Sequence, residues 1–440
     1  SMQTARSGGS TIKVQRGDSL YLLAKRHGVS SRELIEANRL KLLQSREAER
    51  IILRLVKDGR VGVSSTNNIN DQDGLLQRAL EVAPYGAEAR FTLPGRMEYP
   101  SVDGYDPAVE KVTIEEMVQL GQSMIDRVRR EHDGLQCEAR VTRAVATISI
   151  MNSNGCAVSY VKSVCAMALE GNRVREDDML FVGDHEVSPH PILDHRRLTD
   201  TVLQQLEYAR ETAPAPPGPV PVVFSHDAVA QVFVPSLAIA FNGKTVLQGA
   251  SPLVDKLGHK IFDQGLTLWD DPLYPDCAGN RICDDEGMPS QRIMLVDHGV
   301  PKQFLYDLQT AGLARARSTG SADRGMGSVP SPALGVLIVE PGGTPYQDML
   351  ADIPDGLLVE GLLGAGQTNV VGGDFSGNVL LGYKIEKGRI VGRVKNTVVA
   401  GNMYHVLKQG LALSRERKWV GGALLTPAFC CQGVSVSTKG

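Results

Sequence analysis

A proline-rich stretch, ETAPAPPGPVPVV at residues 211–223, constrains the fold of this chain most, because it interrupts the sequence near its middle. Proline lacks a backbone N–H and fixes φ, so this stretch offers few donors to the interior of a helix or a sheet. We therefore expect a semi-rigid, extended connection between two domains. A chain of 440 residues also exceeds the usual size of one hydrophobic core. The sequence predicts an N-terminal domain at 41–215 and a C-terminal domain at 216–440.

The residues before this boundary alternate between helical and strand patterns without a regular strand–helix–strand repeat. Apolar residues recur with helical spacing in DGLLQRALEVA at 73–83 and in TIEEMVQLGQSMIDRVRREH at 113–132. Two β-rich runs flank the KDGR turn at 57–60, which is typical of a hairpin, and two more flank NSNG at 152–155. This order favours an α+β domain over a doubly wound sheet.

The residues after the boundary form short apolar runs separated by Gly, Pro and Asp turns. The clearest case is NVLLGYKIEKGRIVGRV, in which Leu381, Tyr383 and Ile385 alternate up to an EKGR turn and a partner run returns at 390–394. We therefore expect the C-terminal domain to be predominantly β and the whole chain to have an α+β fold.

Charge and composition exclude some partners. Lys and Arg total 47 against 50 Asp and Glu, so nothing suggests a polybasic surface for nucleic acid. No apolar run reaches the roughly 18 residues of a membrane span, so we expect no membrane association. The seven cysteines are odd in number and lack a CxxC pair, which indicates reduced thiols and a cytoplasmic protein.

The segment at 12–40 has clear local signals. Ser19 can cap a helix that Gly28 ends, and Ser30 with Glu33 forms a capping box for a second helix. With the short strand before them, in VQRGDSLYLLAKRHGVS, these helices resemble a LysM module, which implies binding to peptidoglycan or chitin. The closing strand of such a module is missing, so a helical pair that serves the main fold is the alternative. We assign residues 1–40 to this LysM-like segment.

Many stretches beyond residue 40 resemble the TldD/PmbA family, whose members are also called modulators of DNA gyrase. Examples are LRLVKDGRVGVSSTN, DKLGHKIFDQGLTLWDDP and VVGGDFSGNVLLGYKIEKGRIVGRVKNTVVAGN. The resemblance implies an N-terminal α+β domain, a β-rich C-terminal domain and a heterodimeric cytosolic metallopeptidase that acts on unfolded peptides. It further implies that a TldD-type subunit carries zinc, while a TldE or PmbA-type subunit lacks the metal motif and helps to enclose the substrate.

The metal motif of the resembling family, His-Glu-x-x-x-His, would fall in VPVVFSHDAVAQVFVPSLAIAFNG at 220–243. This stretch offers His226 and Asp227, but Gln231 stands where the second histidine is needed. A neutral amide is a poor zinc ligand, and aspartate is one methylene shorter than the glutamate that would activate water. We therefore expect no catalytic residue, no metal ligand and no cofactor in this chain, with zinc in a TldD-type partner subunit.

Another stretch, HEVSPH at 185–190, has the letters of a zinc motif at a different place. Pro189 would clash with the carbonyl of His185 in a helix and would cost roughly 3 kcal/mol. We interpret the stretch as a structural or solvent-exposed loop. A zinc site on His185 and His190, with the Glu186 carboxylate beside them, would need a third ligand that folds back, such as His195.

Three further groups are weaker candidates. One segment is rich in acidic residues: Asp270, Asp271, Asp276, Asp284, Asp285 and Glu286. These residues could bind a hard cation or could simply form turns between strands, and we favour turns. Cysteines 277 and 283 lack nearby histidines, and cysteines 430 and 431 have the context of core packing. The loop GGDFSG could present backbone N–H groups to a peptide or a carboxylate, so we predict these substrate-binding residues: Gly372, Gly373, Asp374, Phe375 and Ser376.

The sequence thus predicts a TldE/PmbA-type subunit that pairs with a zinc-bearing TldD-type chain and binds peptide through strand-like contacts. A glycan-binding scaffold is the alternative from a different class. A metalloenzyme acting alone would need ligands that only the fold could bring together. Whether the chain also forms homo-oligomers stays open.

Overall fold

The computed structural model describes residues 3–7, 10–14, 42, 44–132, 134–175, 178–325 and 329–438. The LysM-like helices expected within 15–40 lie outside the described residues. The chain divides into two compact units, one of Ser1–Ala89 with Val112–Gln122 and one of Arg90–Lys111 with Ser123–Gly440. In the part that the structure describes, no helix has the length and apolar character to cross a membrane.

The described residues of the first unit form two hairpins, a helix, a 3-10 helix and the start of a helix that continues into the second unit. Their elements are β1 (Gln3–Ser7), β2 (Ser10–Val14), β3 (Ile51–Lys57), β4 (Arg60–Thr66), α3 (Gln72–Val82) and the 3-10 helix η1 (Ala83–Tyr85). Asp58 and Gly59 join β3 to β4 with φ of 51° and 75°, so the turn has the left-handed backbone that a tight hairpin needs. A side chain on Gly62 would meet the carbonyl of Ala79, so α3 packs closely on β4. The hairpin and the helix predicted at 57–60 and 73–83 are confirmed.

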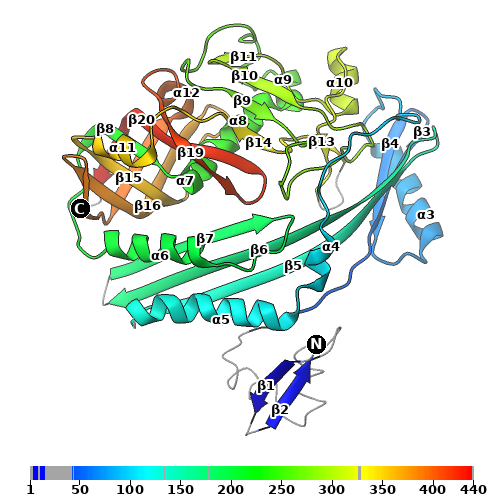
Figure 1. The fold of residues 1–440 in the computed structure, drawn as a ribbon. Helices are drawn as coiled ribbons and strands as arrows, with labels where there is room; N and C mark the ends of the chain where they lie inside the picture. The colour runs from blue at the N-terminus through cyan, green and yellow to red at the C-terminus, as the bar shows by residue number, and fades with distance from the viewer. Residues whose placement is uncertain are drawn as a thin grey trace. The chain divides into compact units, whose positions relative to one another are not determined.

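The second unit begins with a three-stranded antiparallel sheet of long strands (Figure 1). Its strands are β5 (Gln136–Met151), β6 (Ala157–Arg175) and β7 (Asp178–Ser188). The helices of this region are α4 (Pro107–Lys111), α5 (Ile114–Glu131) and α6 (Arg196–Tyr208), and α5 starts in the first unit and ends in the second. Figure 1 shows α6 running along one face of the sheet. The turn predicted at 152–155 joins β5 to β6.

The rest of the second unit is built around an eleven-stranded mixed sheet. Its strands are β8 (Gly218–Phe224), β9 (Leu268–Asp270), β10 (Ile293–Asp297), β11 (Val300–Pro301), β14 (Leu337–Val339), β15 (Asp355–Leu363), β16 (Asp374–Glu386), β17 (Arg389–Arg393), β18 (Thr397–Asn402), β19 (Ala412–Val420) and β20 (Leu424–Thr438). Because β8 pairs with both β15 and β20, the strands β20, β18, β16, β15 and β8 close into a ring of the barrel kind. A separate small pair joins β12 (Ala322–Asp323) to β13 (Ser331–Pro332).

Short helices accompany this sheet. They are α7 (His226–Val232), α8 (Val234–Phe241), α9 (Gly243–Leu247), α10 (Leu308–Ala314), α11 (Tyr346–Ala351) and α12 (Met403–Val406). The aromatic ring of Phe233, at the junction of α7 and α8, lies 5.3 Å from that of Phe224 on β8 and 5.4 Å from that of Phe429 on β20. These buried contacts hold the end of α7 against β8 and β20. The α+β fold with a β-rich C-terminal domain is confirmed.

The prediction of an extended connection throughout 211–223 was wrong for its second half, which forms β8. The sheet tolerates these prolines because β8 pairs with β15 only over Val222–Phe224, beyond them. Pro221 lies in the irregular part of the pairing with β20, where a missing N–H breaks no ladder bond. The domain boundary at 215/216 stays a prediction.

Candidate functional site

The position of the expected metal motif begins helix α7, directly after β8. The side chain of Ser225 caps the helix by accepting a hydrogen bond from Ala228 N, and the Ser225 N–H donates to the Val359 carbonyl of β15. His226 and Asp227 therefore occupy the first turn of α7, at the end of two parallel strands. The apolar face of α7 is buried, as its sequence predicts.

All three side chains at the motif positions contact protein groups. Gln231 Oε1 accepts a hydrogen bond from a backbone N–H of β15 at 2.8 Å. Asp227 Oδ2 lies 2.9 Å from the ammonium nitrogen of Lys418. His226 Nε2 lies 3.5 Å from the Glu416 carbonyl oxygen, and burial together with the Lys418 charge lowers the pKa of His226. The neutral imidazole of His226 is therefore the favoured form.

Lys418, on β19, stands at the centre of this group. Its ammonium donates to Asp184 on β7 as well as to Asp227, and the side chains of Lys418 and Asp184 are only 13 % and 2 % exposed. Burial opposes the charge, but attraction to the two carboxylates outweighs it and raises the pKa of Lys418. Asp184 Oδ1 also accepts from His185 N at 2.8 Å, and among the described residues Asp184 Oδ2 has no hydrogen-bond partner, so Lys418 supplies the positive charge that this carboxylate contacts.

Glu360, on β15, adds a third carboxyl group. Burial raises its pKa to about 7, against the hydrogen bond from Gln205 on α6, and Asp227 adds to the rise. Gln205 Nε2 donates to Glu360 Oε2 at 3.3 Å and to the Gly183 carbonyl at 3.1 Å. We call Asp184, His185, Asp227, Glu360 and Lys418 the Lys418 cluster.

The Lys418 cluster does not fit the zinc that the family motif would hold. Zinc sites of this kind use two imidazoles from one helix, and α7 supplies only one, because Gln231 stands at the second position. The Gln231 oxygen is also occupied, since it already accepts a backbone hydrogen bond from β15. A lysine ammonium stands beside Asp227, and its positive charge repels a metal ion. Through Lys418 the cluster ties β7, α7 and β19 of this chain together, but it offers no ligand set for a hydrolytic metal.

The histidines of HEVSPH diverge, as expected. His185 Nδ1 lies 3.7 Å from Asp227 Oδ1, whereas His190 contacts aspartates of two other segments. His195, which a zinc site in this stretch would have needed as a third ligand, has its Nδ1 3.4 Å from the Thr199 hydroxyl oxygen. The prediction of a loop was wrong up to Ser188, because β7 extends to that residue through pairing with β6.

The predicted substrate loop lies at the start of β16. Its residues are Gly372, Gly373, Asp374, Phe375 and Ser376. The first three N–H groups donate to the turn at 369–370, and the phenylalanine ring is buried in the core. The serine pairs with β18, and the Asp374 carboxylate accepts from Asn402 at 2.8 Å. These bonds order the loop, and its contact with substrate stays a prediction.

The acidic segment is mostly structural, as its turn-forming composition predicts. Asp270 accepts from two N–H groups that precede β14, and Asp284 accepts from N–H groups of three residues. Burial raises the pKa of Asp270 to about 6 against those hydrogen bonds. Asp276 differs, because its carboxylate is exposed and faces His190 at 3.1 Å.

All seven cysteines are free and buried. Cys277 donates to the Gly422 carbonyl at 3.1 Å, and burial raises its pKa to about 11. Cys430 and Cys431 lie on β20 inside the sheet, as core packing predicts. Thiols with raised pKa are poor nucleophiles at neutral pH, so Cys277 offers no reactive group.

The sequence did not reveal Lys418, Asp184 or Glu360 as site residues. Lys418 belongs to the charged run RERKW, which has the composition of a solvent-facing strand. Its contacts to Asp184 and Asp227 span 234 and 191 positions of the chain. Only the fold brings these residues together.

Three family profiles match the sequence. The PmbA/TldA metallopeptidase C-terminal domain matches residues 217–438, and domain 1 of the same metallopeptidase matches 34–83. A LysM domain matches 12–42, nearly all of which lies outside the residues whose side chains the structure describes.

Solved structures and curated proteins agree with these matches. TldE from Thermococcus kodakarensis has a TM-score of 0.84 at 24 % identity, covering 91 % of this chain and 92 % of that one. A Thermotoga maritima protein described as a candidate modulator of a DNA gyrase has a TM-score of 0.79 at 20 % identity, covering 88 % and 89 %. A metalloprotease of Archaeoglobus fulgidus is 25 % identical over 379 residues, 86 % of each chain. An uncharacterized protein of Methanocaldococcus jannaschii is 23 % identical over 390 residues, 87 % of this chain and 88 % of its own.

Proposed function

The chain belongs to the PmbA/TldD family, and within that family we propose that it is a TldE/PmbA-type subunit without a catalytic zinc of its own. It pairs with a zinc-bearing TldD-type subunit in a cytoplasmic metallopeptidase that acts on unfolded or small peptides. The names of the similar metalloproteases and of the TldE structure support the peptidase class and the subunit type.

One observation carries the subunit assignment. At the position of the family motif, the Lys418 ammonium binds Asp227 and Asp184, and Gln231 replaces the second imidazole. A helix with one imidazole and an adjacent ammonium cannot form the tetrahedral zinc site of a metallopeptidase. Peptide hydrolysis therefore requires a second chain that supplies the metal and its activated water.

The β-rich part of the chain is the proposed peptide-binding part. Its mixed sheet carries the loop at 372–377, and among the described residues its strands β11, β17 and β19 each pair with one other strand only. An extended peptide can add main-chain hydrogen bonds to such strands, which gives affinity with little sequence preference. That mode suits a substrate class of unfolded peptides.

The experiment is reconstitution with a family member that carries His-Glu-x-x-x-His. The chain alone should not hydrolyse a fluorogenic unfolded peptide, and the mixture should hydrolyse it in a chelator-sensitive way. His226→Ala in this chain should change kcat/KM of the mixture by less than about twofold, because His226 holds no metal. Chelator-sensitive hydrolysis by the isolated chain, abolished in His226→Ala, would overturn the proposal.

The LysM match supports a second candidate, a glycan-binding scaffold. The resemblance to a LysM module implies binding to peptidoglycan or chitin. The full chain should then sediment with insoluble chitin or peptidoglycan and be released by soluble chito-oligosaccharide. If the chain stays in the supernatant with both polymers, this candidate is eliminated and the peptidase-subunit proposal is unaffected.

A further inference from the structure

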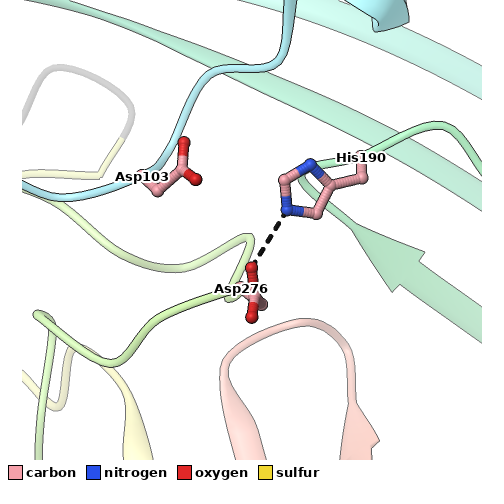
Figure 2. Close-up of side chains that lie close together, drawn as sticks. All are labelled: Asp103, His190 and Asp276. Atoms are coloured by element: carbon pink, nitrogen blue, oxygen red, sulfur yellow. Dashed lines mark hydrogen bonds and ion pairs between the residues drawn. The ribbon is translucent and has the colours of Figure 1, made fainter.

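A second group of metal-ligating side chains lies where three segments of the second unit meet. Asp103 comes from the loop before α4, His190 from the end of β7 and Asp276 from the loop after β9. Each offers one ligand atom, and these atoms all lie within 4.8 Å of one another. Figure 2 shows the two carboxylates approaching the imidazole from separate loops. No other such group of three or more exists among the residues whose placement is described.

His190 has the orientation of a metal ligand. Its Nδ1 lies 3.0 Å from Asp106 Oδ2, and its Nε2 lies 3.1 Å from Asp276 Oδ1. A carboxylate at Nδ1 holds the proton on that nitrogen and leaves the Nε2 lone pair for a cation, as in metal sites with an outer carboxylate. The Nε2 to Oδ1 distance is close to the spacing of about 3.3 Å between two ligands of a tetrahedral zinc ion.

Buried groups hold the segments that carry these ligands. Ser163, which is fully buried, donates from its hydroxyl to the Pro189 carbonyl at 2.7 Å and accepts from Asp106 N at 2.8 Å. The Ser163 N–H also donates to the Gly104 carbonyl at 2.9 Å. One serine thus fixes the segment before α4 and the segment that carries His190 relative to each other.

Asn280 provides an observation independent of the ligands. Its side chain is fully buried, and its Nδ2 donates to the Asp103 carbonyl at 3.1 Å. Its Oδ1 has no partner among the described residues and lies against Gly104, where an added Cβ would come within 2.6 Å of it. The amide therefore faces the segment that carries Asp103. A buried acceptor without a donor is unfavourable, so the segment that carries Asp103 holds an uncompensated polar atom next to this ligand.

The charge of the group also favours a cation. Three carboxylates, of Asp103, Asp106 and Asp276, surround one imidazole. Within the described ranges, no ion pair joins any of them to a lysine or an arginine. A divalent ion would balance this excess of negative charge.

We propose that Asp103, His190 and Asp276 bind a divalent transition-metal ion of the zinc class, with Asp106 orienting His190 and water completing the coordination. The ion takes the place of any proton on His190 Nε2, and that proton leaves to solvent. It joins three segments that are far apart in the sequence, so its role is structural. The site uses none of the motif positions on α7 and does not depend on the proposed function.

The test is isothermal titration of the metal-stripped full chain with Zn²⁺, with Co²⁺ absorption to report the ligand geometry. Wild type should bind one equivalent, and His190→Gln should weaken binding at least about 100-fold, while Asp106→Asn should weaken it about 10- to 100-fold. His298→Gln is the matched control, because His298 pairs with Asp297 at 2.7 Å but belongs to no such group.

The control should bind zinc as wild type does. Circular dichroism and thermal unfolding of each variant show that the fold is retained, and Asp276→Asn, at an exposed side chain, provides a second ligand variant. Absence of saturable binding at one equivalent would overturn the proposal. Equal affinity in His190→Gln, Asp276→Asn and wild type would also overturn it.

Discussion

Two groups of histidine and aspartate side chains in the second unit differ in how their negative charge is balanced. In the Lys418 cluster, an ammonium from β19 binds both Asp184 and Asp227. In the group around His190, three aspartates share one imidazole, and the described residues supply no lysine or arginine ion pair. The first group carries its own cation, and the second has a place for a cation from solution.

This difference shows that residue type alone does not decide whether a site binds metal. His226 and Asp227 have the letters that begin a metal motif, yet a lysine from another strand balances the charge there. His190 belongs to a stretch that resembles a motif only by accident, yet its partners come from two other loops. The site at His226 and Asp227 and the group around His190 therefore differ in whether a side chain of the protein balances the charge of the aspartates.

The largest expected effect comes from removing the internal cation. Lys418→Met should lower the free energy of unfolding by about 3 to 5 kcal/mol, because it leaves two carboxylates, one of them almost fully buried, without compensation. Urea unfolding at pH 7 measures the change. The double variant Lys418→Met/Asp184→Asn should recover part of the loss.

Lys302→Met is the control for this prediction, since Lys302 pairs with Asp297 at 3.1 Å and the two side chains are 42 % and 33 % exposed. It should cost less than about 1 kcal/mol. Equal losses in Lys418→Met and Lys302→Met would contradict the view that Lys418 acts as a buried cation.

The next largest expected effect is the stabilisation of the folded protein by zinc bound at His190. At a free Zn²⁺ concentration of about 100 times the Kd, binding to the folded state adds about 2.7 kcal/mol to the free energy of unfolding. The melting temperature of wild type should rise with zinc, and that of His190→Gln should not. A rise of equal size in both proteins would place the stabilising ion elsewhere.

The pH dependence of the stability of the protein gives a separate test of the Lys418 cluster, through the pKa of Glu360. Burial raises the pKa of Glu360 from its ordinary value of 4.5 to about 7. The folded state therefore keeps its proton more readily than the unfolded state, so this contribution to stability is complete below pH 4.5 and is lost as the pH rises to 7. Glu360→Gln should match wild type at low pH and exceed its stability by on the order of 2 kcal/mol above pH 7.

Urea unfolding of wild type and Glu360→Gln from pH 5 to pH 8 measures this difference. Glu207→Gln, on the exposed surface of α6, is the matched control. A constant difference between Glu360→Gln and wild type across the range would show that Glu360 is not protonated in the folded protein.

The smallest expected effect comes from restoring the motif letter on α7. Gln231→His should give no zinc binding at α7, because Lys418 still binds Asp227 and repels a second cation. It should lower stability by about 1 kcal/mol through the lost hydrogen bond to β15. Zinc titration of Gln231→His in a His190→Gln background isolates α7, and one bound equivalent there would contradict the account.

Local patterns predicted much of the fold. The turns at 57–60, 152–155 and 386–389 and the helices α3 and α5 follow from spacing and turn residues that act over short distances. The path of β8 could not be predicted, because its prolines are tolerated only through the particular pairing with β15 and β20. The sequence also did not predict that HEVSPH continues a strand up to Ser188, because β7 extends there only through its pairing with β6.

The candidate site was predictable only in what it lacks. Gln231 in place of a histidine is visible in the sequence, and the prediction that this chain holds no metal at the motif stays a prediction. Lys418, Glu360 and Asp103 gave no local signal, because their partners lie far away in the chain. The sequence raised His190 and Asp276 as possible ligands of two different sites, and only the fold brings the two side chains together.

The most direct test of this contrast is an anomalous difference map, at the zinc absorption edge, from crystals of the chain grown with Zn²⁺. The account predicts a peak between Asp103, His190 and Asp276 and none beside Lys418. A peak at His226 and Asp227, with no density at His190, would contradict both the assignment of the chain as a subunit without catalytic zinc and the second cation site.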